Sequence, residues 1–351
     1  MPDTLTEIVQ VDSTQPEPKV IERAAALLRA GEVVVFPTET VYGLGADALQ
    51  PTAVQQIFTA KGRPLNDPLI VHIVDRAELT QLTQEIPAVA WQLTQAFWPG
   101  PLTLILPAGP RVPRLVTSGL PTVAVRMPRH PVAQALIRAT GSPIAAPSAN
   151  RFMHVSPTTA QHAYADLSGR VPLILDGGPC EVGVESTILN LCSDVPTVLR
   201  PGGISLEELQ AILPDVRRAQ PRQAHDEQAA FTAPGQMAVH YSPLVPMVLF
   251  EGPSMLNAML HEVQRLHAQS QSVGVLIADE DISVFQESGA RIYALGSTPE
   301  QIAAHLFAGL RTLEDAGVQI ILCRSFAEQG LGLAIHDRLL KAAGGKIVHA
   351  S

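Results

Sequence analysis

The chain has 351 residues, more than a single hydrophobic core usually spans, which predicts two domains. Hydrophobic residues make up 46% of the chain and charged residues 16%, a composition that excludes a disordered protein. The net charge of −9 argues against tight, sequence-independent binding of nucleic acid, and the absence of a long apolar run or a signal-like start predicts a cytoplasmic protein outside the membrane.

Short strands and helices alternate through the first part of the chain. A helix is predicted over residues 18–30, because apolar residues recur at helical spacing and Gly31 follows as a terminator. The alternation predicts an α/β class with a mixed sheet. The predicted strands are 32–36, 69–74, 102–106, 122–127, 143–146, 172–175 and 186–191, and the other predicted helices are 51–60, 76–97, 131–139 and 158–166.

The composition changes near residue 245. Only Pro246, Pro253 and Pro299 of the 30 prolines lie beyond it. The polar stretch 217–232 is typical of a linker, so we predict a first domain over 1–215, a linker or lid over 216–245 and a second domain over 246–351. In the second domain, strands at 247–250, 272–278, 291–294 and 318–322 alternate with helices from Pro253 and Pro299, which predicts a small Rossmann-like parallel sheet.

A loop at the end of the first buried strand, FPTETVYGLG over residues 36–45, brings two threonine hydroxyls, a phenol and two glycines together. Such loops present polar groups to ligands, and glycine lets the backbone approach closely. A tight turn with capping hydroxyls explains the segment equally well.

Two cations, Lys61 and Arg63, stand one residue apart after a predicted helix. Lysine as a point charge and arginine as a fork suit the clamping of a polyphosphate. The chain contains no G-x-x-x-x-G-K-[ST] loop. For two charges alone, a solvated basic turn is the better interpretation. His72 lies in the apolar run 69–74, which favours a core histidine.

Arg126 lies on the predicted strand TVAVRMP and shares one face with Thr122 and Ala124, because side chains alternate along a strand. A buried arginine needs an anionic partner. Either a ligand carboxylate or phosphate, or a structural acid, would serve, and the strand alone slightly favours the acid.

The segment APSAN, residues 146–150, ends another strand in small residues that permit close approach of a planar or phosphate group. Ser148 and Asn150 add hydrogen-bonding side chains. Downstream, Ser156-Pro157 predicts an N-cap for the helix from Thr158, and a cap and a ligand role are compatible.

Three glycine-rich turns at strand ends, over 176–179, 183–187 and 199–203, each stand beside a hydroxyl, an acid or an arginine. Their number favours a composite, loop-built site for small anions over unrelated turns. The three cysteines form no C-x-x-C pair and no histidines cluster with them, so neither a disulfide framework nor a zinc site is expected, and no residue is predicted as a metal ligand.

Together these segments resemble the threonylcarbamoyl-AMP synthase family in its long form, whose first domain has the YrdC-like fold. The resemblance runs from about Ile21 to the C-terminus, and its most specific part pairs Lys-x-Arg with Ser-x-Asn. It implies a twisted mixed-sheet catalytic domain followed by a Rossmann-like domain. The segments that carry it are FPTETVYGLG, AKGRPLNDPLIVH, TVAVRMP, APSAN, SPTTA, DGGPCEVGVESTI, LRPGG and APGQMAVHYSP.

The resemblance also implies site residues. Lys61 and Arg63 would be catalytic, Arg126 would pair with the threonine carboxylate, and the segment 233–243 would form a lid in which Tyr241 covers the nucleotide. The implied threonine site comprises Thr38, Thr40, His72, Arg126, Ala146 and Ser186. The implied ATP site comprises Lys61, Arg63, Asn66, Thr122, Ser148, Asn150, Ser156, Arg200 and Tyr241.

The implied reaction joins L-threonine, bicarbonate and ATP into threonylcarbamoyl-AMP and pyrophosphate, with Mg²⁺ accompanying ATP. Fixed cations would stabilise charge on the phosphoryl oxygens, and no residue is identified as a general base. The product would pass to tRNA threonylcarbamoyl-transferase proteins, which modify an adenosine beside the anticodon.

Two alternative functions remain open from the sequence. The carbamoyl-adenylating module of hydrogenase maturation shares the fold but normally belongs to a much longer chain with acylphosphatase and zinc-finger parts. An RNA-binding module is disfavoured by the net charge of −9 and by the 4% content of aromatic residues. The chain departs from the family near Met153, where a glycine often stands.

Overall fold

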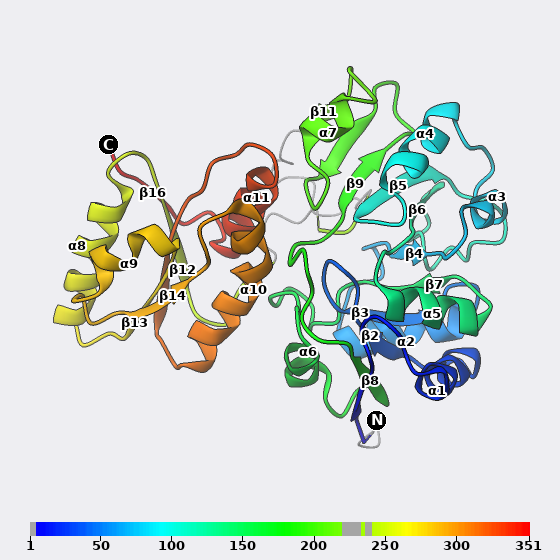
Figure 1. Ribbon diagram of the computed structural model, residues 1–351, viewed down its shortest axis with the longest axis horizontal. Helices are drawn as coiled ribbons and strands as arrows, with labels where there is room; N and C mark the ends of the chain where they lie inside the picture. Colours follow the sequence, from blue (N-terminus) through cyan, green and yellow to red (C-terminus); the bar gives the residue numbers. More distant parts are fainter. Residues whose placement is uncertain (1–4, 220–232, 236–240) are drawn as a thin grey trace. The chain divides into compact units, whose positions relative to one another are not determined.

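The computed structural model describes residues 5–219, 233–235 and 241–351 (Figure 1). The predicted linker residues 220–232 and 236–240 therefore lie outside the described residues. Among the helices that are described, none has the length and apolar character needed to cross a membrane. Two compact units are present, the first with Met1–Phe152, Pro157–Glu181 and Glu185–Gln236, the second with Met153–Ser156, Val182–Val184 and Met237–Ser351.

A mixed sheet forms the centre of the first unit. Its strands are β1 Glu7–Gln10, β2 Val34–Phe36, β3 Gly43–Asp47, β4 Ile70–His72, β5 Leu102–Pro107, β6 Thr122–Arg126, β7 Ile144–Ala145, β8 Leu173–Asp176, β9 Thr187–Asn190, β10 Thr197–Arg200 and β11 Arg217–Arg218. They lie in the order β1-β8-β2-β3-β7-β4-β6-β5-β9-β10-β11. Because β4 runs parallel to β6 and β5 runs antiparallel to it, the predicted mixed sheet is confirmed.

Helices cover both faces of this sheet. Neighbouring residues of β2 point to opposite faces, so that Val34 belongs to one apolar core and Val35 to the other. Helices α1 and α5 supply Leu28 and Leu136 to the first core, and α2 supplies Ile57 to the second. The helices are α1 Pro18–Arg29, α2 Pro51–Lys61, η1 Arg76–Glu78, α3 Leu79–Leu82, α4 Ala88–Phe97, α5 Pro131–Thr140, α6 Ala160–Leu167 and α7 Leu206–Gln210.

The continuous helix predicted over 76–97 is wrong. The chain forms the short η1 and α3, leaves the helical path at Thr83, and resumes in α4 after Pro87. Thr83 is extended and pairs with Ala108 in an isolated β-bridge. A proline at the start of α4 is compatible with a helix start but not with a helix interior, which explains the break.

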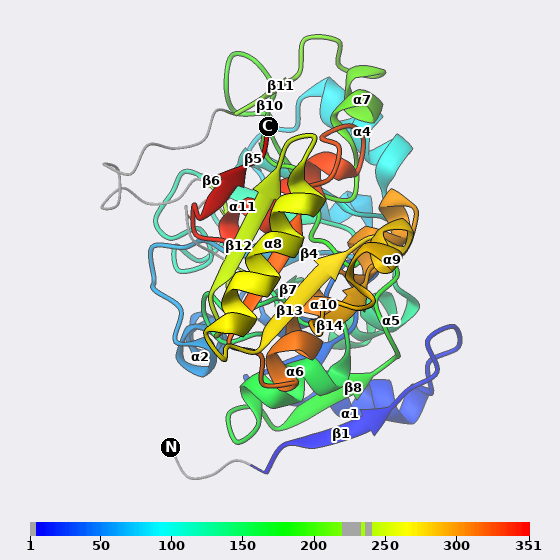
Figure 2. The same cartoon turned by 90° about the vertical axis from the view of Figure 1, so that its left-hand side faces the viewer.

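A parallel sheet forms the centre of the second unit, as predicted, in the order β14-β13-β15-β12-β16. Its strands are β12 Met247–Glu251, β13 Val273–Ile277, β14 Arg291–Ala294, β15 Ile320–Arg324 and β16 Ile347–His349. Its helices are α8 Met255–Ala268, η2 Asp279–Asp281, α9 Ile282–Phe285, α10 Pro299–Asp315 and α11 Gly332–Ala342. Figure 2 shows α8 crossing one face of this sheet, where Val263 and Leu266 join its apolar core.

Candidate functional site

Three adjacent strands of the first unit place polar side chains in one row. The register pairs His72 of β4 with Arg126 of β6, and Arg126 with Thr103 of β5. Ser186 directly precedes β9, and its Oγ lies 2.7 Å from Thr103 Oγ1. The sheet therefore brings together His72, Arg126 and Ser186, which stand far apart in the sequence.

Arg126 is buried and surrounded by acceptors. Its Nη1 donates to Thr40 Oγ1 at 2.9 Å, and its Nη2 lies 2.8 Å from Glu39 Oε1, although these two atoms are not aligned for a hydrogen bond. Burial favours a raised pKa for Glu39, but Arg126 and the backbone N–H of Arg129 outweigh burial and lower it. A structural acid was one of the two partners predicted for Arg126, and Glu39 is that acid. The sequence prediction did not name it.

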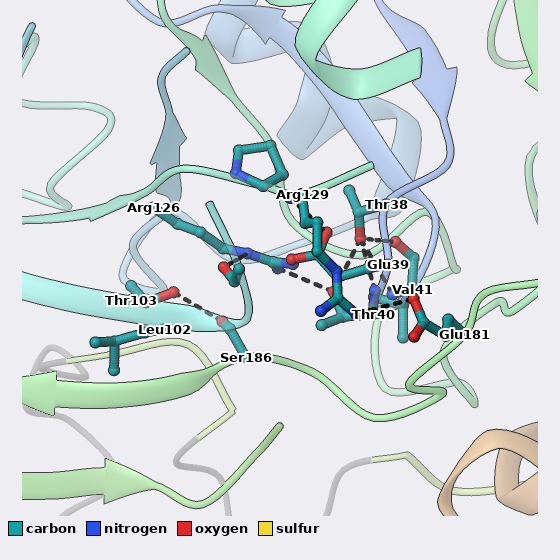
Figure 3. Close-up of polar contacts among 12 residues, drawn as sticks. Thr38, Glu39, Thr40, Val41, Leu102, Thr103, Arg126, Arg129, Glu181 and Ser186 are labelled. Atoms are coloured by element: carbon teal, nitrogen blue, oxygen red, sulfur yellow. Dashed lines mark hydrogen bonds and ion pairs between the residues drawn. The ribbon is translucent and has the colours of Figure 1, made fainter. Parts of the chain in front are cut away.

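The hydroxyls beside Arg126 have a fixed direction (Figure 3). Thr38 donates its proton to the carbonyl oxygen of Val41 at 2.6 Å, so the 2.9 Å bond between Thr38 and Thr40 must use the proton of Thr40. Thr40 in turn accepts from Arg126. The hydroxyl protons of Thr38 and Thr40 are therefore both used in hydrogen bonds. The oxygen of Thr40 accepts from Arg126 and so orients its guanidinium.

His72 is buried beside this row, and its ring packs edge-on against Phe36 at a centroid distance of 6.4 Å. Burial, followed by the positive charge of Arg126, lowers the pKa of His72 to about 3, so the imidazole is neutral near pH 7. Its Nδ1 makes no well-aligned hydrogen bond, although the backbone of Ile144 and of Ile70 acts on the ring. The prediction of a core histidine therefore agrees with its burial. Ala146 lies alongside, and its N–H donates to Ile70 O at 2.9 Å.

The Lys-x-Arg and Ser-x-Asn segments meet at Lys61. The Lys61 Nζ donates to the carbonyl oxygens of Ser148 at 2.6 Å and of Asn150 at 2.5 Å. The helix α2 ends at Lys61 because Gly62 adopts a left-handed conformation with φ of 66°. Burial, and then the nearby charge of Arg63, lower the pKa of Lys61 well below its usual value. An anionic ligand would stabilise the charged ammonium.

Arg63 forms a buried ion pair with Asp67 at 2.8 Å and donates to the carbonyl oxygens of Asp67 and Pro68. Both carboxylate oxygens of Asp67 lack a hydrogen bond. Burial raises the pKa of Asp67 in spite of Arg63 and Lys61. The predicted Asn66 is exposed in the same turn. Asp67 was not predicted, and its only sequence signal is its place directly after Asn66 in the Lys-x-Arg segment.

Arg200 ends β10 and connects the two groups of residues. Its Nη2 donates to Ser186 O at 2.9 Å and to Ser186 Oγ at 3.2 Å, and its charge also acts on Asp67. Its Nη1 lies 3.5 Å from Pro234 O. Ala233 packs with Ile70 and other residues of the sheet, so this described piece of the predicted linker belongs to the site. Thr122 is half-buried at the start of β6.

Two predicted ATP residues, Ser156 and Tyr241, are grouped with the second unit. Ser156 is not the predicted N-cap, because α6 begins at Ala160 and Thr159 accepts the capping bond from the N–H of His162. Tyr241 stacks on Phe307 at 5.6 Å, and the guanidinium of Arg338 lies 4.9 Å from the Tyr241 ring centroid. Contact of Tyr241 with a nucleotide stays a prediction.

Comparisons with known proteins cover both units. A family model described as "Telomere recombination" matches residues 26–202, and one described as "Threonylcarbamoyl-AMP synthase, C-terminal domain" matches residues 204–344. The chain is 46% identical over 331 residues to a threonylcarbamoyl-AMP synthase of Bacillus subtilis, which covers 93% of this chain and 94% of the relative. It is 43% identical to the Pyrococcus abyssi enzyme of the same name, over 98% of this chain and 99% of the relative.

Solved structures agree with these relatives. The crystal structure of Pyrococcus abyssi Sua5 complexed with L-threonine superposes with a TM-score of 0.92 at 41% identity, covering 98% of this chain and all of that one. The structure of Escherichia coli YciO matches with a TM-score of 0.50 at 27% identity, covering 57% of this chain and 96% of that one. The same relatives therefore match both units of the chain in sequence and in structure.

Proposed function

Because this chain belongs to the threonylcarbamoyl-AMP synthase family, we propose that it joins L-threonine, bicarbonate and ATP into threonylcarbamoyl-AMP and releases pyrophosphate. The observation that carries this proposal is the bond from Lys61 Nζ to the carbonyl oxygens of Ser148 and Asn150, which joins the two most specific segments into one site. The relatives cover 93% or more of the chain, which favours this function over a hydrogenase-maturation module or an RNA-binding protein.

L-threonine fits the row formed by His72, Arg126 and Ser186. Its carboxylate would bind Arg126, whose Nη2 is close to Glu39 but makes no hydrogen bond with it. The neutral His72 offers an Nδ1 that makes no well-aligned hydrogen bond to a polar group of the same ligand. A buried polar atom without a partner costs free energy, and a ligand that pairs with it recovers that cost. Thr38, Thr40 and Ala146 would complete the site.

ATP fits the cations that surround Asp67. Lys61, Arg63 and Arg200 would hold the phosphates, with Ser148 and Asn150 beside them. The remaining proposed nucleotide residues are Asn66, Thr122, Ser156 and Tyr241. Attack of the threonine amine on the carbon of bicarbonate gives a carbamate and releases one molecule of water. A carbamate oxygen then attacks the α-phosphorus of ATP, and the bond from that phosphorus to the leaving pyrophosphate breaks. Catalysis would consist of positioning and of stabilising the developing negative charge by fixed cations, with no covalent nucleophile.

Asp67 suits Mg²⁺ by its chemistry. Mg²⁺ is commonly held by one or two carboxylates together with substrate phosphates. The two Asp67 oxygens lack hydrogen bonds and lie beside Lys61 and Arg63. When bound, Mg²⁺ would neutralise charge on the phosphate oxygens. Asp67 would hold the ion. Without the ion, the negative charge of Asp67 would repel the phosphates of the nucleotide.

The substitution Asp67→Asn should raise the Mg²⁺ concentration for half-maximal pyrophosphate release by at least about tenfold, because it removes the anionic ligand. Asp67 also pairs with the buried guanidinium of Arg63 at 2.8 Å. The same substitution removes this charge partner, so it should also lower the melting temperature at pH 7. Asp194→Asn, at an exposed acid, is the matched control. An unaltered Mg²⁺ titration would remove Asp67 from the metal site.

Pyrophosphate release by the full-length protein tests the function. We expect release from ATP to require both threonine and bicarbonate, and omission of either to reduce it to background. A transfer reaction with purified threonylcarbamoyl-transferase proteins and tRNA would then show modification beside the anticodon. Release that proceeds equally without threonine would refute the proposal.

A further inference from the structure

Helix α10 of the second unit holds a short segment that belongs, by sequence, to the catalytic domain. Residues 153–156 are grouped with the second unit. They follow Asn150 of the Ser-x-Asn segment closely and end at Ser156, another proposed nucleotide residue. The position of this segment therefore sets the position of Ser156.

Two side chains of α10, one helical turn apart, bind this segment. Arg311 Nη2 donates to the carbonyl oxygen of Val155. Glu314 Oε1 lies 3.2 Å from His154 Nε2, and both side chains are nearly buried, with 13% and 10% of their surface exposed. One bond fixes the backbone and the other fixes a side chain, so the segment has little freedom to rotate.

Glu314 also binds the chain that follows the predicted lid. Its Oε2 accepts from the N–H of Leu244 at 2.8 Å. Nearby, the N–H of Ser242 donates to the carbonyl oxygen of Met153 at 2.9 Å. Burial alone would raise the pKa of Glu314, but the bonds from His154 and Leu244 lower it, so the carboxylate is charged at neutral pH. Glu314 thus contacts His154, two residues before Ser156, and Leu244, three residues after Tyr241.

The backbone of the segment needs this support. Met153 has a φ of 69°, which lies in the left-handed region. Residues other than glycine, asparagine and aspartate rarely adopt this conformation. A conformation of this kind is strained and persists where surrounding contacts hold it. The chain therefore departs from the family at a backbone position that favours glycine. Contacts from α10 and from Ser242 hold the segment in this conformation.

We propose that Arg311 and Glu314 are positioning residues for ATP: they fix residues 153–156, and through them Ser156, in the conformation that binds the nucleotide. The inference rests on the proposed function. The residues proposed to bind threonine all lie in the first unit. Their loss should weaken ATP binding without affecting threonine binding.

The test compares Glu314→Gln with Asp315→Asn in the full-length protein. Asp315 is the next residue of α10 and is exposed, so its substitution removes the same charge without reaching the segment. We expect Glu314→Gln to raise the KM for ATP about tenfold, the effect of losing one charge-assisted hydrogen bond. The KM for threonine should stay within about twofold of the unsubstituted enzyme in both variants.

Two further comparisons separate positioning from general stability. Arg311→Lys, which keeps the charge, should restore part of the ATP affinity lost in Arg311→Met. His154→Gln combined with Glu314→Gln should raise the KM for ATP no more than Glu314→Gln alone, because both act through one contact. Equal KM values for ATP in Glu314→Gln and Asp315→Asn would overturn the inference, as would a parallel rise in the KM for threonine. An unsubstituted enzyme without threonine-dependent release would instead overturn the proposed function.

Discussion

Replacing Lys61 with methionine should lower threonine-dependent pyrophosphate release by about a thousandfold, the upper range for loss of one preorganised donor. Methionine keeps an unbranched stem of similar length but carries no charge. In the free protein, Lys61 is a buried cation whose pKa is lowered by burial and by Arg63, so its charge opposes folding there. Asp166, Asp67 and the carbonyl oxygens of Ser148 and Asn150 offset part of this effect, and a polyphosphate would favour the charge further. The variant should lose some stability with these two bonds, but far more catalysis.

The assay for Lys61→Met is the rate of pyrophosphate release at saturating threonine and bicarbonate, with the melting temperature as the check on folding. Lys19→Met, at an exposed lysine, is the matched control for the loss of one positive charge. Lys61→Arg adds a test of shape, because a planar fork cannot reproduce the two bonds to Ser148 and Asn150. A folded Lys61→Met variant with more than about a tenth of the original rate would exclude Lys61 from catalysis.

The Arg126→Gln variant should lose threonine binding, with kcat/KM for threonine falling by at least about a hundredfold, because a buried pairing of charges with the carboxylate disappears. It should also be destabilised, by about 3–5 kcal/mol, because Glu39 is left as an unpaired buried charge. The pKa of Glu39 is lowered from its usual 4.5, so the ion pair contributes at pH 7 and is lost only as the pH falls below 4.5. Lost activity alone would therefore not distinguish binding from folding.

The double substitution of Glu39→Gln with Arg126→Gln separates the two effects. Removing both charges takes away the unpaired carboxylate, so the melting temperature should recover most of what Arg126→Gln lost. Threonine use should stay as low as in the single variant. Recovery of threonine-dependent release in the double variant would show that Arg126 acts only by pairing with Glu39.

Much of the site was predictable because side-chain direction in a strand follows from position alone. The two-residue period put Thr122, Ala124 and Arg126 on one face, and the structure places Ala124 in a small core with Ile70 while Arg126 lies in the row with His72. The mixed and parallel sheets were likewise predictable from the alternation of elements. The partner of Arg126 was not, since Glu39 comes from a loop about ninety residues away whose path no local pattern specifies.

Each wrong or missing prediction has a specific structural cause. In the stretch 76–97, Pro87 is unsuited to a helix interior, and the pairing of Thr83 with Ala108, a tertiary contact, ends the first helix early. Strand β3 has the sequence GLGAD, whose glycines are poor strand formers, and it forms because neighbouring strands supply its hydrogen bonds. Ser156 had an ideal capping sequence, but Thr159 took that place.

The row of His72, Arg126 and Thr103 exists only in one register of three neighbouring strands. An inserted or deleted residue within β6 would turn Arg126 toward the apolar core that contains Val123 and Val125, away from Glu39. Such a change would remove the proposed anchor for an amino acid and destabilise the core. Over evolutionary time, insertions and deletions should therefore accumulate in the turns between these strands. The lengths of β4, β5 and β6 themselves should stay constant.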